Sequence, residues 1–316
     1  MDFSYVLMIL FYWFFLTGAV FLTGAFSKRF FVTGPSNADI CMIEGRKRSF
    51  GESAVRSIFL IAVITFFANI VHLIFHASIM TETPLKEVFS ILSPFLTKTK
   101  YGRFTVLRMI FVGIIIILSL MSIMRDTKGL TIFGILVSCC LLIVIAMSGH
   151  QGTKGYFTVP FYLDVLHLMA VSLWIGGLFF IRFCYTFFLE GAGAELWEQF
   201  CYLINRYSQI ATYSVFLVGV TGLLLAYSNI NDIAGLIGTR YGQVLLLKFL
   251  LVGILFLLGG INKFFIVPAF NQHDANRRAD LLPQRKRLFR LVTAEVYIGS
   301  VVLLLTSILT HLHPEG

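Results

Sequence analysis

Long apolar runs alternate with short polar segments along the whole chain. Eight of these runs are each long enough to cross roughly 30 Å of hydrocarbon at about 1.5 Å of rise per residue. Because a backbone inside a bilayer has no water to bond, we expect every run to be an α-helix. The predicted spans are residues 5–26, 54–76, 104–124, 130–149, 160–185, 208–227, 244–261 and 288–311. The pattern therefore predicts an all-α, polytopic membrane protein with eight transmembrane helices.

The composition agrees with this class. The chain of 316 residues is 58% hydrophobic and only 13% charged, and its formal net charge is +9. The basic residues lie between the apolar runs rather than along one face, so we expect them to contact membrane lipids and not nucleic acid. The five cysteines include no C-x-x-C pair, which argues against a disulfide framework or a zinc knuckle.

The distribution of Lys and Arg predicts the orientation of the chain. Counted together with the first or last four residues of the adjoining spans, the segments that follow odd-numbered spans hold 17 basic residues, whereas those that follow even-numbered spans hold 6. Cytoplasmic loops of membrane proteins carry the excess of basic residues. We therefore expect a multi-pass protein whose N- and C-termini are both extracytoplasmic.

A short motif occurs twice. Residues 99–102 read Thr-Lys-Tyr-Gly, residues 239–242 read Thr-Arg-Tyr-Gly, and a basic residue, Arg108 or Lys248, follows each copy. We expect both of these basic side chains to snorkel to the membrane interface. The motif predicts two parallel four-helix repeats, an organisation that is common in transporters. The two predicted repeats are residues 1–150 and residues 151–316.

Six of the seven histidines are expected at one face of the membrane, at or near the ends of four spans. His72 and His76 are four residues apart and share one helix face, as a chelating pair needs. Imidazole suits copper, zinc, iron and nickel, whereas the thioether of Met selects Cu(I), so this set favours copper. The candidate ligands are His72, His76, His150, His167, His311, Met80, Met147 and Met169.

The stretch that begins at Asp164 carries a second signal. Asp164 and His167 lie one helical turn apart inside an apolar span, where ionisable residues are usually kept for function. We expect Asp164 and Trp174 to contact the metal ligands without binding the metal themselves, with Asp164 as the partner that orients His167. The Gly-Gly pair that follows, Gly176 and Gly177, allows a second helix to approach closely.

We expect His72, His76, His150 and His167 to converge on one metal site, because they are predicted to lie on the same side of the membrane. A histidine at a helix end also caps the last carbonyls or lies in the membrane interface. That simpler interpretation stays open for each histidine taken singly, and it is the gathering of six on one side that favours a shared site.

Several of these residues resemble the CopD family of bacterial copper-resistance membrane proteins. The resemblance covers about residues 140–312 and rests on a His-x6-Trp-x-Gly-Gly pattern, from His167 to Gly177, that follows a span ending in Gly149 and His150. Further residues that carry it are Arg206, Thr221, Gly222, Tyr241, Gly242, Lys248, Asn262 and Glu295. The resemblance implies copper handling at the bacterial plasma membrane, usually as import. It also implies a CopC-like extracytoplasmic copper carrier, which for this chain is expected to be a separate protein.

No nucleophile–histidine–acid motif, Walker A loop or phosphorylatable aspartate signature is present, so we expect a non-enzyme whose transport is passive or driven by an ion gradient. One alternative stays open. Helices with histidines near one membrane face also ligate haem b, and the His-x6-Trp pattern resembles the HemJ family of protoporphyrinogen oxidases. In that case the protein is a haem-linked oxidoreductase, and a strong Soret band distinguishes it from a copper protein.

Overall fold

The computed structural model describes residues 3–27, 44–124, 127–189, 194–229, 233–268 and 282–312. Within these ranges the chain folds almost entirely into helices. The long helices are α1 (Phe3–Phe26), α3 (Glu44–Met80), α5 (Lys100–Met124), α6 (Lys128–Met147), α10 (Ala194–Asn229), α12 (Arg240–Ile261) and α14 (Leu282–His311). A further long helix consists of α8 (Val159–Val171), the π-helix η1 (Ser172–Gly176) and α9 (Gly177–Leu189). The short elements are α4 (Val88–Lys98), α7 (His150–Lys154), α11 (Ile233–Gly238) and a second π-helix, η2 (Asn262–Ile266).

Among the described residues, 8 helices are long and apolar enough to cross a membrane. They are Phe3–Phe26, Arg56–Met80, Lys100–Ser122, Gly129–Met147, Val159–Phe183, Tyr202–Asn229, Arg240–Ile266 and Lys286–His311. Each coincides with one of the apolar runs of the sequence. The prediction of an all-α, polytopic membrane protein with eight transmembrane helices is therefore confirmed, whereas the two-repeat organisation stays a prediction.

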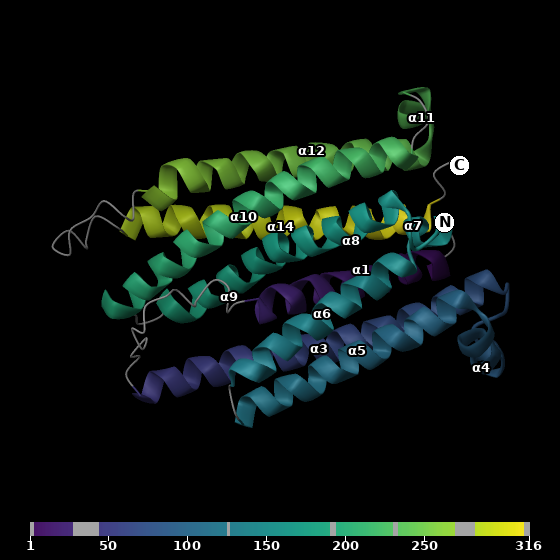
Figure 1. The fold of residues 1–316 in the computed structure, drawn as a ribbon, viewed down its shortest axis with the longest axis horizontal. Helices are drawn as coiled ribbons and strands as arrows, with labels where there is room; N and C mark the ends of the chain where they lie inside the picture. The colour runs from purple at the N-terminus through teal and green to yellow at the C-terminus, as the bar shows by residue number, and fades with distance from the viewer. Residues whose placement is uncertain are drawn as a thin grey trace.

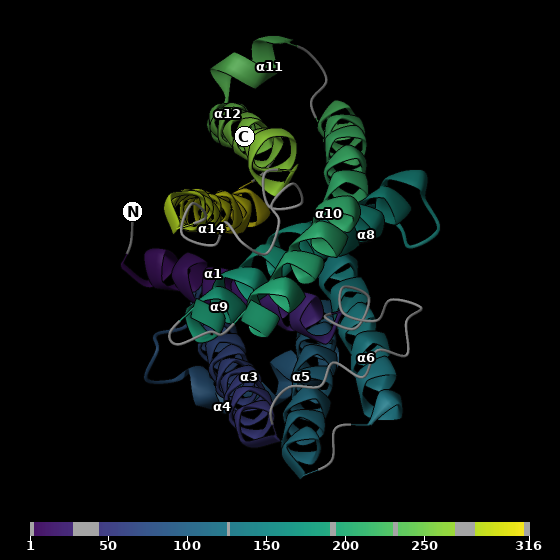
Figure 2. The same ribbon diagram turned by 90° about the vertical axis from the view of Figure 1, so that its left-hand side faces the viewer.

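Helix α1 lies between two groups of helices (Figures 1 and 2). It packs against α3 and α6 on one side and against η1, α9 and α14 on the other. Its middle section is fully enclosed, because Phe15, Leu16, Val20 and Leu22 are at most 1% exposed. A helix that is apolar all round is expected to be buried in this way.

The two ends of the described chain lie at the same end of the bundle, which we call the terminal end (Figure 1). This follows from the number of spans, because eight crossings return the chain to the side from which it started. The short helices α4, α7 and α11 also lie at the terminal end (Figure 1).

The backbones of α1 and η1 touch where they cross. A Cβ atom built on Gly24 would lie 2.3 Å from the carbonyl carbon of Gly176, and one built on Gly176 would lie 2.3 Å from the carbonyl oxygen of Val20. Glycine on both helices is what permits this approach, as it does in other membrane-protein crossings. The close helix contact predicted from the Gly-Gly pair is thus confirmed at Gly176.

The repeated Thr-basic-Tyr-Gly motif has the same local structure in both copies. The hydroxyl of Thr99 accepts a hydrogen bond from the Gly102 amide at 2.9 Å, and that of Thr239 accepts one from the Gly242 amide at 3.0 Å. Each threonine thereby caps the first turn of a long helix, α5 or α12. Each glycine also lies against the short helix before it, with no room for a Cβ atom.

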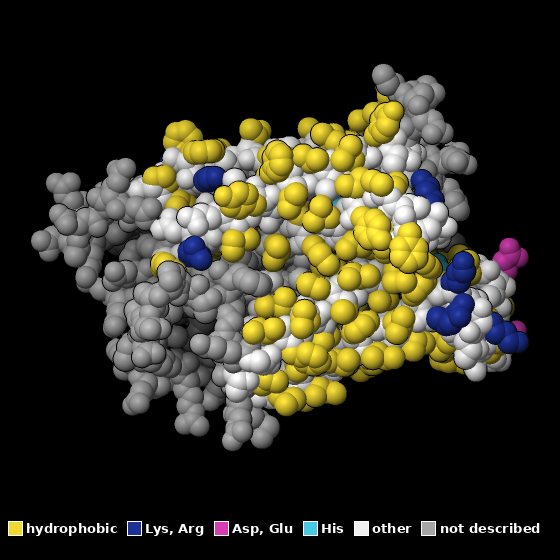
Figure 3. Space-filling model, in the orientation of Figure 1, with side chains coloured by type: hydrophobic (Ala, Val, Ile, Leu, Met, Phe, Trp, Pro, Cys, Tyr) yellow, Lys and Arg dark blue, Asp and Glu magenta, His cyan; other side chains and the backbone are white. Residues whose placement is uncertain are grey.

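The surface has the pattern of a membrane protein. Hydrophobic side chains cover the middle of the molecule, and Lys and Arg side chains lie towards its two ends (Figure 3). Large apolar residues such as Phe67, Phe216 and Leu257 are more than half exposed along the spans. A surface of this kind is stable only against lipid or another apolar solvent.

Candidate metal centre

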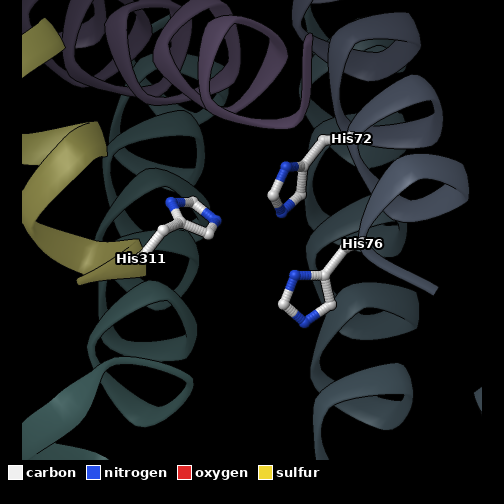
Figure 4. A group of neighbouring side chains, drawn as sticks. All are labelled: His72, His76 and His311. Carbon is white, nitrogen blue, oxygen red and sulfur yellow. The ribbon is translucent and has the colours of Figure 1, made fainter. Parts of the chain in front are cut away.

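Three histidines meet at the terminal end of the bundle. His72 and His76 come from α3 and His311 comes from the end of α14, and the three rings point towards one another (Figure 4). One ring nitrogen from each lies within 4.8 Å of the others. The spacing of four residues on α3 places two imidazoles on one face, as the sequence predicted, and α14 supplies the third. We call these three residues the histidine cluster.

Hydrogen bonds to backbone carbonyls fix the orientation of two of the rings. The Nδ1 atom of His72 lies 3.0 Å from the carbonyl oxygen of Met8, and that of His311 lies 2.8 Å from the carbonyl oxygen of Ser307. Because a carbonyl oxygen can only accept, Nδ1 carries the proton in both rings. Both Nε2 atoms therefore carry a lone pair and no proton, the usual arrangement for metal-binding histidines.

Two tyrosines, Tyr101 and Tyr12, also contact the cluster. The Tyr101 hydroxyl donates to Nε2 of His72 at 2.6 Å, and the Tyr101 ring stacks on His76 with centroids 3.9 Å apart. The Tyr12 ring lies 4.9 Å from the His72 ring and 5.1 Å from the His311 ring. Tyr101 thus satisfies Nε2 of His72, and this hydrogen bond would have to break for the same nitrogen to bind a metal.

His76 is the member of the cluster whose ring nitrogens lack a hydrogen-bond partner in the described part of the chain. Both of its ring nitrogens are buried, and neither has a hydrogen-bond partner among the described residues. Leaving a buried polar atom without a partner costs about 1–3 kcal/mol. A metal ion between the three rings would supply the partner that the protein does not.

A buried cation lies beside the cluster. Arg108 is 1% exposed, and its guanidinium lies 5.8 Å from the centre of the Tyr12 ring and 5.6 Å from that of Tyr101. It also donates a hydrogen bond to the Ser148 hydroxyl. The interpretation that Arg108 snorkels to the membrane interface is therefore wrong, because aromatic faces and a hydroxyl hold its charge inside the protein.

The remaining predicted histidines line a neighbouring cavity of about 340 Å³. The Nε2 atom of His150 lies 3.2 Å from the carbonyl oxygen of Leu309, and the Nδ1 atom of His167 lies 2.9 Å from the Thr221 hydroxyl. The structure thus brings three predicted ligands together in the histidine cluster and leaves two outside it. The same cavity is lined by Asp164, Trp174, Tyr241 and Lys248.

The predicted methionines lie around these sites rather than inside the cluster. Met80 ends α3 one turn beyond His76, but it is 63% exposed. Met147 is half-buried at the end of α6, and Met169 packs against the main apolar core. Two further histidines, His273 and His313, lie outside the described residues.

Sequence reasoning missed the surroundings of the cluster. Tyr12 sits in an apolar run with no distinguishing neighbour, so nothing in the sequence marked it. Tyr101 and Arg108 belong to the repeated motif, and that repetition was a signal of importance. Most of their partners come from other helices, and pairing between helices is not visible in one sequence.

Comparison with known proteins finds a family model for each half of the chain, and the two models are related. The model for the "copper resistance protein D-like, N-terminal domain" matches residues 2–156, and that for "copper resistance protein D" matches residues 202–309. The chain is 28% identical to "copper transport protein CutJ" of Bacillus subtilis (strain 168), over 54% of this chain and 29% of CutJ. It is 26% identical to "inner membrane protein YebZ" of Escherichia coli (strain K12), over 69% of this chain and 70% of YebZ. The matched part therefore spans less than a third of the length of CutJ. No solved structure matches the chain.

Proposed function

Because the chain belongs to the copper resistance protein D family, we propose that it binds copper at the histidine cluster and carries the ion across the plasma membrane. The observation that supports this most directly is the convergence of His72, His76 and His311, with ring nitrogens within 4.8 Å of one another. Backbone carbonyls hold the Nδ1 atoms of His72 and His311, whereas the ring nitrogens of His76 have no hydrogen-bond partner among the described residues.

The donor set favours copper among the metals that imidazole binds. Metal–nitrogen bonds of about 2.0 Å in a trigonal site hold the ligand nitrogens about 3.5 Å apart, so the rings need to close in by roughly 1 Å. Side-chain rotation of that size is compatible with the partly exposed positions of His76 and His311. Neutral imidazole ligands without a carboxylate are poor partners for magnesium, calcium or manganese.

The charge beside the site favours Cu(I) over divalent ions. Arg108 is buried next to Tyr12 and Tyr101, which both contact the cluster. Repulsion between two cations grows in proportion to the charge of each, so Arg108 disfavours a doubly charged ion about twice as strongly as a singly charged one. Cu(I) bound to three neutral imidazoles keeps the total charge of this region lower.

The position of the cluster supports uptake from outside the cell. It lies at the terminal end, and the excess of basic residues at the other end predicts that the terminal end is extracytoplasmic. Copper then reaches the cluster from that side, either free or from a separate CopC-like carrier. Asn69 lies one helical turn deeper than His72 on α3, is 0% exposed and has two unpartnered polar atoms, which makes it the next polar position along an inward route.

Copper binding to the purified protein tests this proposal. We expect one Cu(I) per chain in competition with a chromogenic chelator, and X-ray absorption at the copper edge is expected to report nitrogen ligands only. H76A should weaken binding by at least about tenfold, because it removes one of three ligands. H150A is the matched control, since His150 lines the neighbouring cavity, and it should bind as the wild type does.

Transport requires a second measurement. Proteoliposomes that contain the wild type are expected to accumulate Cu(I) faster than empty vesicles, and H76A should lose this difference. Equal copper affinities for the wild type and H76A, with both proteins monodisperse on size exclusion, would overturn the proposed site. Accumulation no faster than in empty vesicles would overturn transport.

A further inference from the structure

A second cavity lies deeper in the molecule, away from the terminal end. Its volume is about 240 Å³, and α10, α12, η2 and α14 line it together with Trp174 of η1. Glu295 projects into it from α14 and is only 3% exposed. Asn262 of η2 donates a hydrogen bond to Oε1 of Glu295, and Glu295 makes no ion pair with any described residue. We call this space the Glu295 cavity.

The hydrogen bonds around Glu295 fit a protonated carboxyl group. The side-chain oxygen of Asn262 is buried without a partner, although the nitrogen of the same amide is bonded to Glu295. A carboxylic acid beside an amide can form two hydrogen bonds, since the amide N–H donates to one carboxyl oxygen and the acid O–H donates to the amide oxygen. A proton on Glu295 would therefore satisfy Asn262 and also remove an unpaired buried charge, which is otherwise costly.

The Glu295 cavity adjoins the cavity that is lined by Asp164 and His167, which we call the outer cavity. Trp174 and Phe256 line both spaces, and their rings lie 5.5 Å apart. Along α14, Thr306 lines the outer cavity and Glu295 the deeper one, a separation of about 16 Å at 1.5 Å per residue. The two cavities are thus arranged along the direction of the spans, with one aromatic pair between them.

The other ionisable groups of the Glu295 cavity are held by local contacts. In the Glu295 cavity, the Lys263 amine donates to the Thr212 hydroxyl at 2.7 Å, and the Tyr207 hydroxyl donates to the carbonyl oxygen of Trp174 at 2.8 Å. The outer cavity is lined by the ionisable residues Tyr12, His150, Asp164, His167, Tyr241 and Lys248. Both π-helices contribute to the deeper cavity, and π-helical turns are frequent at functional sites.

We propose that the outer cavity and the Glu295 cavity together form a proton pathway. Protons enter the outer cavity, which Asp164 lines, pass the Trp174–Phe256 pair and are carried by Glu295. Each step moves a proton between water and a side-chain oxygen, so no other bond changes and no electron is transferred. The oxygen donors of Glu295 and Asn262 suit a proton and not soft Cu(I). The pathway is separate from the histidine cluster, which lies between α3 and α14.

Proton flux into copper-free proteoliposomes tests the pathway. A potassium diffusion potential set with valinomycin drives protons inward, and a trapped pH-sensitive dye reports them. Wild-type vesicles are expected to acidify faster than empty vesicles, and E295Q should lower the protein-dependent rate by at least about tenfold, because an amide cannot carry the proton. E87Q makes the same chemical change at an exposed carboxylate next to α4 and should leave the rate unchanged.

Two further measurements keep the result independent of folding and of copper. E295Q should bind Cu(I) at the histidine cluster as tightly as the wild type, which shows that the variant is folded. Infrared difference spectra of the wild type on changing pH should contain a carboxylic acid C=O band from a buried group. Wild-type flux equal to that of empty vesicles, or equal flux in E295Q and the wild type, would overturn the pathway. So would the absence of the buried carboxylic acid band.

Discussion

The contact between α1 and η1 allows a quantitative prediction for G24A. In the native structure the new methyl carbon would lie 2.3 Å from the carbonyl carbon of Gly176 and 2.6 Å from its Cα atom. Ordinary carbon–carbon contacts are about 3.5–4.0 Å, so the two backbones have to separate by roughly 1 Å. Both obstructing atoms belong to the backbone, and rotation of a side chain therefore cannot relieve the clash.

The expected loss of stability combines two effects. Overpacking of this kind costs about 1–3 kcal/mol, whereas replacing a helical glycine by alanine gains about 0.5–1 kcal/mol through reduced backbone entropy. G24A should therefore be destabilised by about 1–2 kcal/mol. G113A is the matched control, because nothing lies within 4 Å of a Cβ atom at Gly113 on α5. That variant should be as stable as the wild type or slightly more stable.

Thermal unfolding in detergent, followed by intrinsic tryptophan fluorescence at one fixed scan rate, measures the difference. About 2–4 °C of Tm corresponds to 1 kcal/mol in domains of 150–250 residues, so G24A is expected to unfold several degrees below G113A. If G24A and G113A unfold at the same temperature, the backbones of α1 and η1 are not in contact and the reasoning fails.

Three other predictions follow from features described above. A reporter enzyme fused after Gly316 should be active outside the cytoplasm, and activity inside would reverse the proposed orientation. The purified protein should show no Soret band; a strong one would favour the haem alternative over copper. N69L should stabilise the protein by about 1–3 kcal/mol, because it removes two unpartnered polar atoms, and should slow copper movement; a lower Tm than the wild type would contradict this.

The sequence predicted the spans because the bilayer imposes a strong local rule. A run of about 20 apolar residues is visible without knowing its neighbours, so each predicted span coincides with a helix of the structure. The pairing of His72 with His76 was also predictable, since it depends only on the helical repeat.

What failed at the sequence level depends on which helices are neighbours. His150 was expected beside His72 and His76, but the third member of the cluster is His311, because α14 packs against α1 next to α3. Arg108 was assigned to the interface for the same reason, since the aromatic rings and the hydroxyl that hold it come partly from other helices. Charge and hydropathy along the chain contain no record of these contacts.

The composition of the histidine cluster has a consequence for biosynthesis. Two of its imidazoles are inserted with α3, early in translation, and the third arrives only with α14, the last helix of the described chain. Until α14 enters the membrane and packs against α1, His72 and His76 of the nascent chain provide no more than two nitrogen ligands. A ribosome that stalls before α14 therefore releases a product in which the proposed copper site is incomplete, so that metal loading at this site would be postponed until α14 has been inserted and packed.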